Sequence, residues 1–191
     1  MSSKGNVSLN ISQAVSVLKE TYRNLEELFN EMDRVAGEEN FISLTPKFLR
    51  WRSDTNYNGW LVASFIKVYQ YNEGMEMQID GLQEGAVFAV EVNLEEWESG
   101  AVICLMKYDF DLSQWTRLPG VSDHWIFWNP FYFEKHFDQD CINDIWYTKT
   151  YEDMQSRYWG LRSGMAVEIP LHTVTSTEDV RTKIFDALRR M

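Results

Sequence analysis

Alternation of apolar and polar residues predicts two neighbouring strands in the middle of the chain. From residue 101 to residue 112, every second side chain is apolar, aromatic or a thiol. The other face of this run begins with Ile103 and Leu105 and ends with Asp109 and Asp111, so that end should reach solvent. Residues 86–93 form a second, almost wholly apolar run. Because a glycine-containing loop separates the runs, the pattern predicts a central antiparallel hairpin.

The first forty residues predict a long amphipathic helix. Apolar residues recur at steps of three and four from Ile11 to Ala36, and glutamates and arginines occupy the opposite face. Asn10 or Ser12 can cap its start, and Gly37 marks its end. The apolar stripe is wider than a coiled-coil seam. We therefore expect this helix to pack on the sheet rather than to self-associate.

The remaining pattern completes an α+β domain. Strands are predicted at 41–51 (an edge strand, because Pro46 interrupts it), 60–71, 75–79, 124–129 and 165–171, and helices at 142–154 and from Ser176 to the end. Helical spacing in 60–71 leaves a helix as the alternative there, although its residue types favour a strand. The expected fold is α+β: a long N-terminal helix packed on a largely antiparallel meander sheet, with a short C-terminal helix, in a single domain of residues 1–191.

Charge and cysteine usage exclude several classes of partner and site. The 29 acidic and 18 basic residues give a net charge of −11, which repels nucleic-acid phosphates and anionic membranes but suits a protein partner. The two cysteines lack the spacing of a zinc site or a disulfide framework. The N-terminal residues carry no apolar signal core, and no apolar run is long enough to span a membrane. These features predict a cytoplasmic protein without a cofactor.

Aromatic residues crowd the segment 115–159, which is where a binding surface is expected. Tryptophan and tyrosine join a large apolar area to a polar tip and are enriched at interfaces and in pockets. Such a segment can also be a second hydrophobic core. The strand predicted here puts Trp128 on its buried face and Trp125 on the other. We therefore assign Trp125, Tyr132 and Trp159 to a binding surface.

An acidic stretch in the same segment is the first candidate for metal binding. Glu134, His136, Asp138, Asp140 and Asp144 could together offer oxygens and an imidazole to a divalent cation. The glycine and the ligand spacing of a calcium loop are missing, however. The sequence therefore predicts no metal, and His136, Asp138 and Asp140 are assigned to the binding surface.

A second acidic pair resembles a nuclease motif. Asp80, followed by Glu91 on an apolar strand, resembles the magnesium-binding carboxylates of the PD-(D/E)xK nucleases. Asn93 stands where that family has its lysine, and the resemblance covers only Asp80 to Asn93. The sequence thus leaves two functions: a non-catalytic binding module for a protein partner, and, as the alternative, a metal-dependent hydrolase or nuclease-like enzyme. It assigns no catalytic residue.

Overall fold

The computed structural model describes residues 3–55, 57–95 and 100–191, which divide into two compact units, residues 1–34 and 35–191. Helix α1, Ser3–Glu38, occupies the first unit and ends in the second. The prediction of a long N-terminal helix is confirmed. Its predicted start at Asn10 or Ser12 is wrong, because the helix already begins at Ser3. The packing of this helix on the sheet involves both units and stays a prediction.

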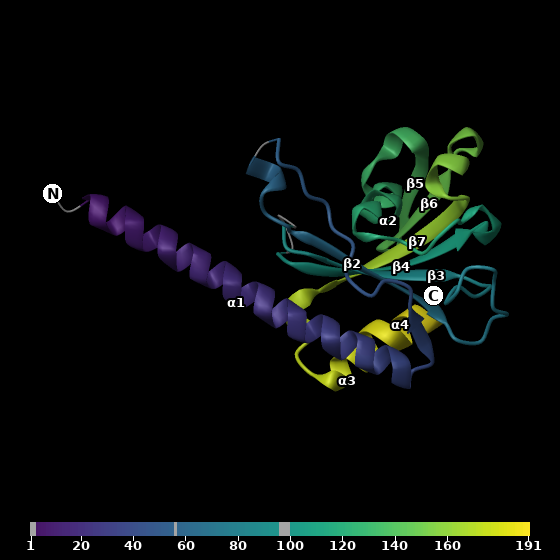
Figure 1. The fold of residues 1–191 in the computed structure, drawn as a ribbon, viewed down its shortest axis with the longest axis horizontal. Coiled ribbons are helices and arrows are strands. Elements are labelled where there is room, and N and C mark those ends of the chain that lie inside the picture. Colours follow the sequence, from purple (N-terminus) through teal and green to yellow (C-terminus); the bar gives the residue numbers. More distant parts are fainter. Residues whose placement is uncertain (1–2, 56, 96–99) are drawn as a thin grey trace. The chain divides into compact units, whose positions relative to one another are not determined.

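The described strands of the second unit form one antiparallel sheet of seven strands (Figure 1). They are β1 Phe41–Ser43, β2 Ser64–Tyr71, β3 Val87–Asn93, β4 Val102–Phe110, β5 Phe137–Ile142, β6 Ile145–Thr150 and β7 Leu161–Pro170. Their order is β1-β2-β3-β4-β7-β6-β5. Strands β1 to β4 are the predicted meander, and β5 to β7 form a second one that joins the first where β7 pairs with β4.

The two central strands pair as predicted. Their register runs from Val87 opposite Tyr108 to Asn93 opposite Val102. The predicted buried face of β4 is buried, and at its charged end Asp109 is exposed. The loop between these strands includes residues 96–99, which lie outside the described residues. The pattern was sufficient here because one face of each strand packs into the main hydrophobic core and most of the other face is buried as well.

The strand predicted at 124–129 is wrong, because these residues begin helix α2, His124–Tyr132. Ile126 and Phe127 are fully buried in the core beneath this helix. The carbonyl of Phe127 accepts a hydrogen bond from the buried Tyr108 hydroxyl of β4. The preference of aromatic and β-branched residues for strands depends on packing against neighbouring strands. Here the packing of this segment on β4 overrides that preference.

The helix predicted at 142–154 is also wrong, because β5 and β6 form a hairpin there. Asn143 and Asp144 form its two-residue turn and have φ angles of 52° and 62°. Two consecutive left-handed residues give the turn whose twist matches that of paired strands.

The strand predicted at 75–79 is reduced to one bridge between Glu76 and Gln83. The strands predicted at 60–71 and 165–171 are confirmed as β2 and β7.

The end of the chain covers the β1–β2 side of the sheet. Helix α3, Thr177–Asp179, continues through a π-helical turn, Val180–Phe185, into α4, Asp186–Arg190. The predicted cap is confirmed, since the Ser176 hydroxyl accepts the Asp179 N–H at 3.1 Å. Phe185 packs edge-on against Tyr69 of β2, with 5.4 Å between ring centroids. One sheet face is thus covered by α2, and part of the other by the C-terminal helices (Figure 1).

Candidate functional site

The predicted aromatic binding residues lie against the core. Trp125 and Tyr132 are on α2, and both are partly buried. Trp159 precedes β7 in a left-handed conformation and contacts Trp115 edge-on at 5.4 Å. The guanidinium of Arg117 lies 4.9 Å from the centre of its ring. Most of the ring area of Trp125 and Trp159 is therefore used within the molecule.

His136 belongs to a buried network rather than to an acidic surface. Only 8% of this residue is exposed, and its Nδ1 lies 2.9 Å from the hydroxyl of Tyr158. That hydroxyl also accepts a hydrogen bond from the Asn129 amide at 3.0 Å. The ring of Trp125 contacts Tyr158 as well, with 5.1 Å between centroids. Tyr158 therefore joins two of the predicted binding residues inside the core.

We expect Trp125→Ala and Trp128→Ala to destabilise the protein by similar amounts, because both indoles pack against the main core from the same helix. The expected loss is about 3 kcal/mol for each variant. Thermal melting measures it, and Trp51→Ala is the matched control because Trp51 is half exposed. If Trp125→Ala melts like the wild type, Trp125 is free to serve as a binding residue.

A cluster of polar side chains lies between α2 and the sheet. Glu91 is fully buried on β3 and accepts hydrogen bonds from the Ser64 hydroxyl at 2.6 Å and from the Tyr132 hydroxyl at 3.3 Å. Nε2 of His124 lies 2.8 Å from the same Ser64 oxygen. The single proton of Ser64 goes to Glu91, so the imidazole donates to Ser64. In a Ser-His-Asp triad the histidine instead accepts the serine proton. The cluster is therefore arranged to anchor α2.

The ionisation of this cluster follows from its burial. Burial lowers the pKa of His124 to about 4, so the imidazole is neutral at pH 7. Burial and the nearby Glu91 raise the pKa of Tyr132. Asp80, the other half of the nuclease-like pair, is exposed in the loop between β2 and β3. Within the described ranges, no group of three His, Cys, Asp or Glu side chains could hold a metal ion.

A different surface combines exposed and half-buried side chains from four strands. Cross-strand register aligns them in two rows on the sheet face opposite α2: Asp140–Tyr147–Met165–Lys107 and Asp138–Lys149–Ser163–Asp109. We call these eight residues the open face. The members on β5 and β6 are exposed, whereas Lys107, Ser163 and Met165 are half-buried. The two carboxylates predicted as binding residues, Asp138 and Asp140, belong to it.

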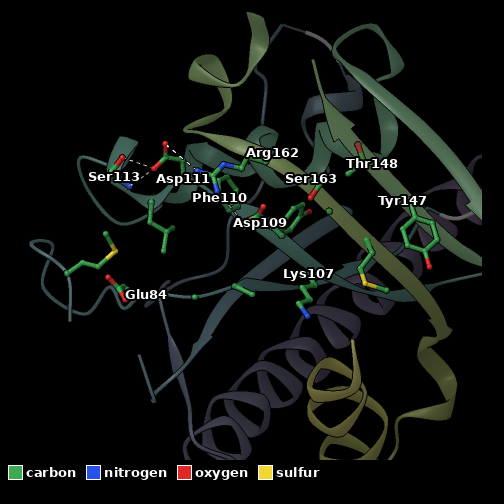
Figure 2. Close-up of a pocket in the computed structure, with 17 residues that line it drawn as sticks. Glu84, Lys107, Asp109, Phe110, Asp111, Ser113, Tyr147, Thr148, Arg162 and Ser163 are labelled. Carbon is green, nitrogen blue, oxygen red and sulfur yellow. Dashed lines mark hydrogen bonds and ion pairs between the residues drawn. The ribbon is translucent and has the colours of Figure 1, made fainter. Parts of the chain in front are cut away.

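A groove of about 770 Å³ opens onto this face at the junction of β4 and β7 (Figure 2). Lys107, Asp109 and Tyr147 line it together with Arg162 and Asp111. The guanidinium of Arg162 lies 4.0 Å from a carboxylate oxygen of Asp109 and 3.7 Å from one of Asp111. The groove thus offers a cation, carboxylates and an aromatic ring within a single depression.

Local conformation explains why the groove forms where it does. The β4–β7 pairing shifts register between Asp109 and Phe110, where Arg162 is an extra residue on β7 and lines the groove. Asp111 is held by the Ser113 hydroxyl at 2.6 Å. That hydrogen bond, together with contacts from Gln114 and Arg162, lowers the pKa of the Asp111 carboxyl. The charged lining is therefore fixed in place by short-range contacts.

Sequence reasoning found only part of this site. The charged end of β4 was predicted to reach solvent, and this expectation is confirmed for Asp109. Tyr147 was missed because its segment was predicted to be helical. The available signal was Asn143–Asp144 between two β-branched residues, which is typical of a tight hairpin.

Comparison of the chain with protein-family models, with curated proteins and with solved structures finds no match. Of the helices that the structure describes, none has the length and apolar character needed to cross a membrane.

Proposed function

We propose that the protein is a non-catalytic binding module that docks a protein partner on the open face. The observation that carries this proposal is the continuity of the groove with exposed apolar side chains on the β5–β6 hairpin. Tyr147 is 40% exposed within the groove lining, and Ile142 is 51% exposed near the hairpin tip.

The extent of this surface favours a protein over a small molecule. Ligand pockets of this volume usually enclose most of their ligand. Here the apolar side chains continue beyond the groove along the hairpin. Tyrosine, tryptophan and methionine are enriched at protein interfaces, whose rims carry polar groups. The open face combines Tyr147 and Met165 with flanking polar groups from Asp138, Lys149 and Asp109.

The charge of the molecule defines the partner further. The chain carries −11, and Asp138, Asp140 and Asp109 add carboxylates to the open face. Long-range attraction would therefore speed association with a basic protein surface, and the effect would weaken with salt. The same charge opposes binding to nucleic acid.

The proposal is tested by replacing the aromatic residue at the centre of the face. We expect Tyr147→Ser to weaken capture of a partner from cells of the source organism by about 30-fold, the effect of removing an interface anchor. Quantitative mass spectrometry of proteins cross-linked to wild type and variant measures this. Tyr57→Ser is the matched control, because Tyr57 is 74% exposed in a loop before β2. Equal recovery with both variants would refute docking at this face.

A further inference from the structure

Strand β5 lies at one end of the sheet order, so one of its long edges has no neighbouring strand among the described residues. Asp138 and the residues from Asp140 to Ile142 are exposed along it. An edge strand presents backbone N–H and C=O groups that can pair with another chain. β5 is therefore a surface for strand addition if those groups point outward.

The hairpin turn determines which groups point outward. A two-residue turn of this type is closed by a hydrogen-bonded pair, here Ile142 and Ile145. Hydrogen-bonded and non-hydrogen-bonded pairs then alternate along the ladder. Asp140 and Asp138 consequently bond to β6, whereas the peptide groups of Gln139 and Cys141 face the free edge.

Two contacts agree with this alternation. The N–H of Cys141 donates to the carboxylate of its neighbour Asp140 at 2.8 Å, and so does not donate to β6. Further along, the N–H of Tyr151 donates to the carbonyl of His136 at 3.3 Å, as a hydrogen-bonded pair at that position requires. A backbone carbonyl of an incoming strand would replace the Asp140 carboxylate as the acceptor for the Cys141 N–H. The Asp140 carboxylate would then be released to bind a cationic side chain.

The side chains on this edge select the chemistry of the incoming strand. Asp138 and Asp140 project onto the open face, and the groups across from them on β6 are Lys149 and Tyr147. One lysine leaves the pair of carboxylates with a net negative charge. A second copy of β5 would bring like charges together, which is unfavourable. Lysine or arginine at alternate positions of the new strand would match both carboxylates.

We propose that β5 takes up an extended, basic segment of the partner as an additional antiparallel strand, an inference that rests on the proposed function. Main-chain hydrogen bonds to Gln139 and Cys141 provide the pairing. The carboxylates of Asp138 and Asp140 select lysine or arginine at alternate positions. This is the strand-addition mode of peptide recognition, in which backbone bonds give affinity and alternate side chains give specificity.

The probe is a short, blocked peptide in which lysine alternates with valine, and the control peptide has glutamate in place of lysine. We expect the lysine peptide alone to bind, with the largest NMR shifts at the amides of Gln139 and Cys141. Cys141→Pro removes an outward N–H without removing a bond to β6, so it should weaken binding on the order of fivefold. Cys141→Ala is the matched control and should bind like the wild type.

Each contrary outcome has a defined meaning. If the peptide fails to bind, shifts other strands instead, or binds the Cys141→Pro and Cys141→Ala variants equally, strand addition at β5 is wrong. The amide shifts of the wild type decide the matter even if the proline variant is unfolded. The Tyr147→Ser experiment is independent of this probe, so a partner lost with that variant would keep the proposed function while the inference fails.

Discussion

Gly160→Ala is expected to lower the free energy of unfolding by about 3 kcal/mol or more. Gly160 has a φ of +82°, and a Cβ there would lie 2.7 Å from the carbonyl oxygen of Asp111. The backbones of these two residues are also joined by a hydrogen bond, since the N–H of Asp111 donates to the carbonyl of Gly160 at 2.8 Å. The clash therefore pushes apart the two segments that form the groove end of β4 and β7. Urea denaturation measures the loss.

Gly100→Ala separates the clash with Asp111 from the strain of alanine in a left-handed backbone. Gly100 has a similar φ of +75°, but a Cβ there would meet no atom of the described residues within 4 Å. Alanine at this position should lower stability only by the strain of the left-handed backbone, about 1 kcal/mol. Equal losses in the two alanine variants would show that contact with Asp111 contributes nothing.

Acid is expected to destabilise the protein through His124. Its pKa is about 4 in the folded state and 6.5 when unperturbed. Above pH 6.5 both states are neutral at this site, so it does not affect stability. As the pH falls from 6.5 to about 4, the unfolded chain binds a proton that the folded protein does not, and about 3 kcal/mol of stability is lost. Urea denaturation at several pH values across this window measures the loss.

Two histidine variants distinguish the effect of the His124 imidazole from that of the carboxylates, which also titrate in acid. His124→Gln should flatten the pH dependence of stability between pH 6.5 and 4, whatever it does to stability at pH 7. His172→Gln is the matched control, because it removes an exposed histidine. A wild-type profile that persists in the His124 variant would contradict burial of this imidazole in its neutral form.

The pattern of apolar and polar residues within a segment was enough to predict the strands that are buried along most of their length. β3 is almost wholly apolar because it is buried from Val87 to Val92, and β4 is charged only near its exposed end. Each of these signals is contained within its own strand. Helix α2 was not predicted because its residues have strand-favouring types, and packing on the sheet beneath it selects the helix. Its stripe of His124, Trp128 and Tyr132, at spacings of four, is visible once a helix is assumed.

The candidate site could not be assembled from sequence for a topological reason. Asp138 and Asp140 were singled out as polar residues near aromatic ones, and Asp109 as the exposed end of a strand. What joins them is the placement of β7 between β4 and β6, which pairs Ser163 with both Asp109 and Lys149. No pattern within a single segment of the chain specifies that neighbourhood.

The position of β7 has a consequence for how the chain folds during synthesis. Strands β1 to β4 can form one meander and β5 to β6 a separate hairpin, but Leu161–Pro170 is needed to join them. Until that last strand leaves the ribosome, β4 and β6 each expose an unpaired edge in the nascent chain. Chaperones and other nascent chains encounter those edges before the native partner does. Completion of the domain is therefore expected to be late and cooperative, with the formation of β7 as the committing step.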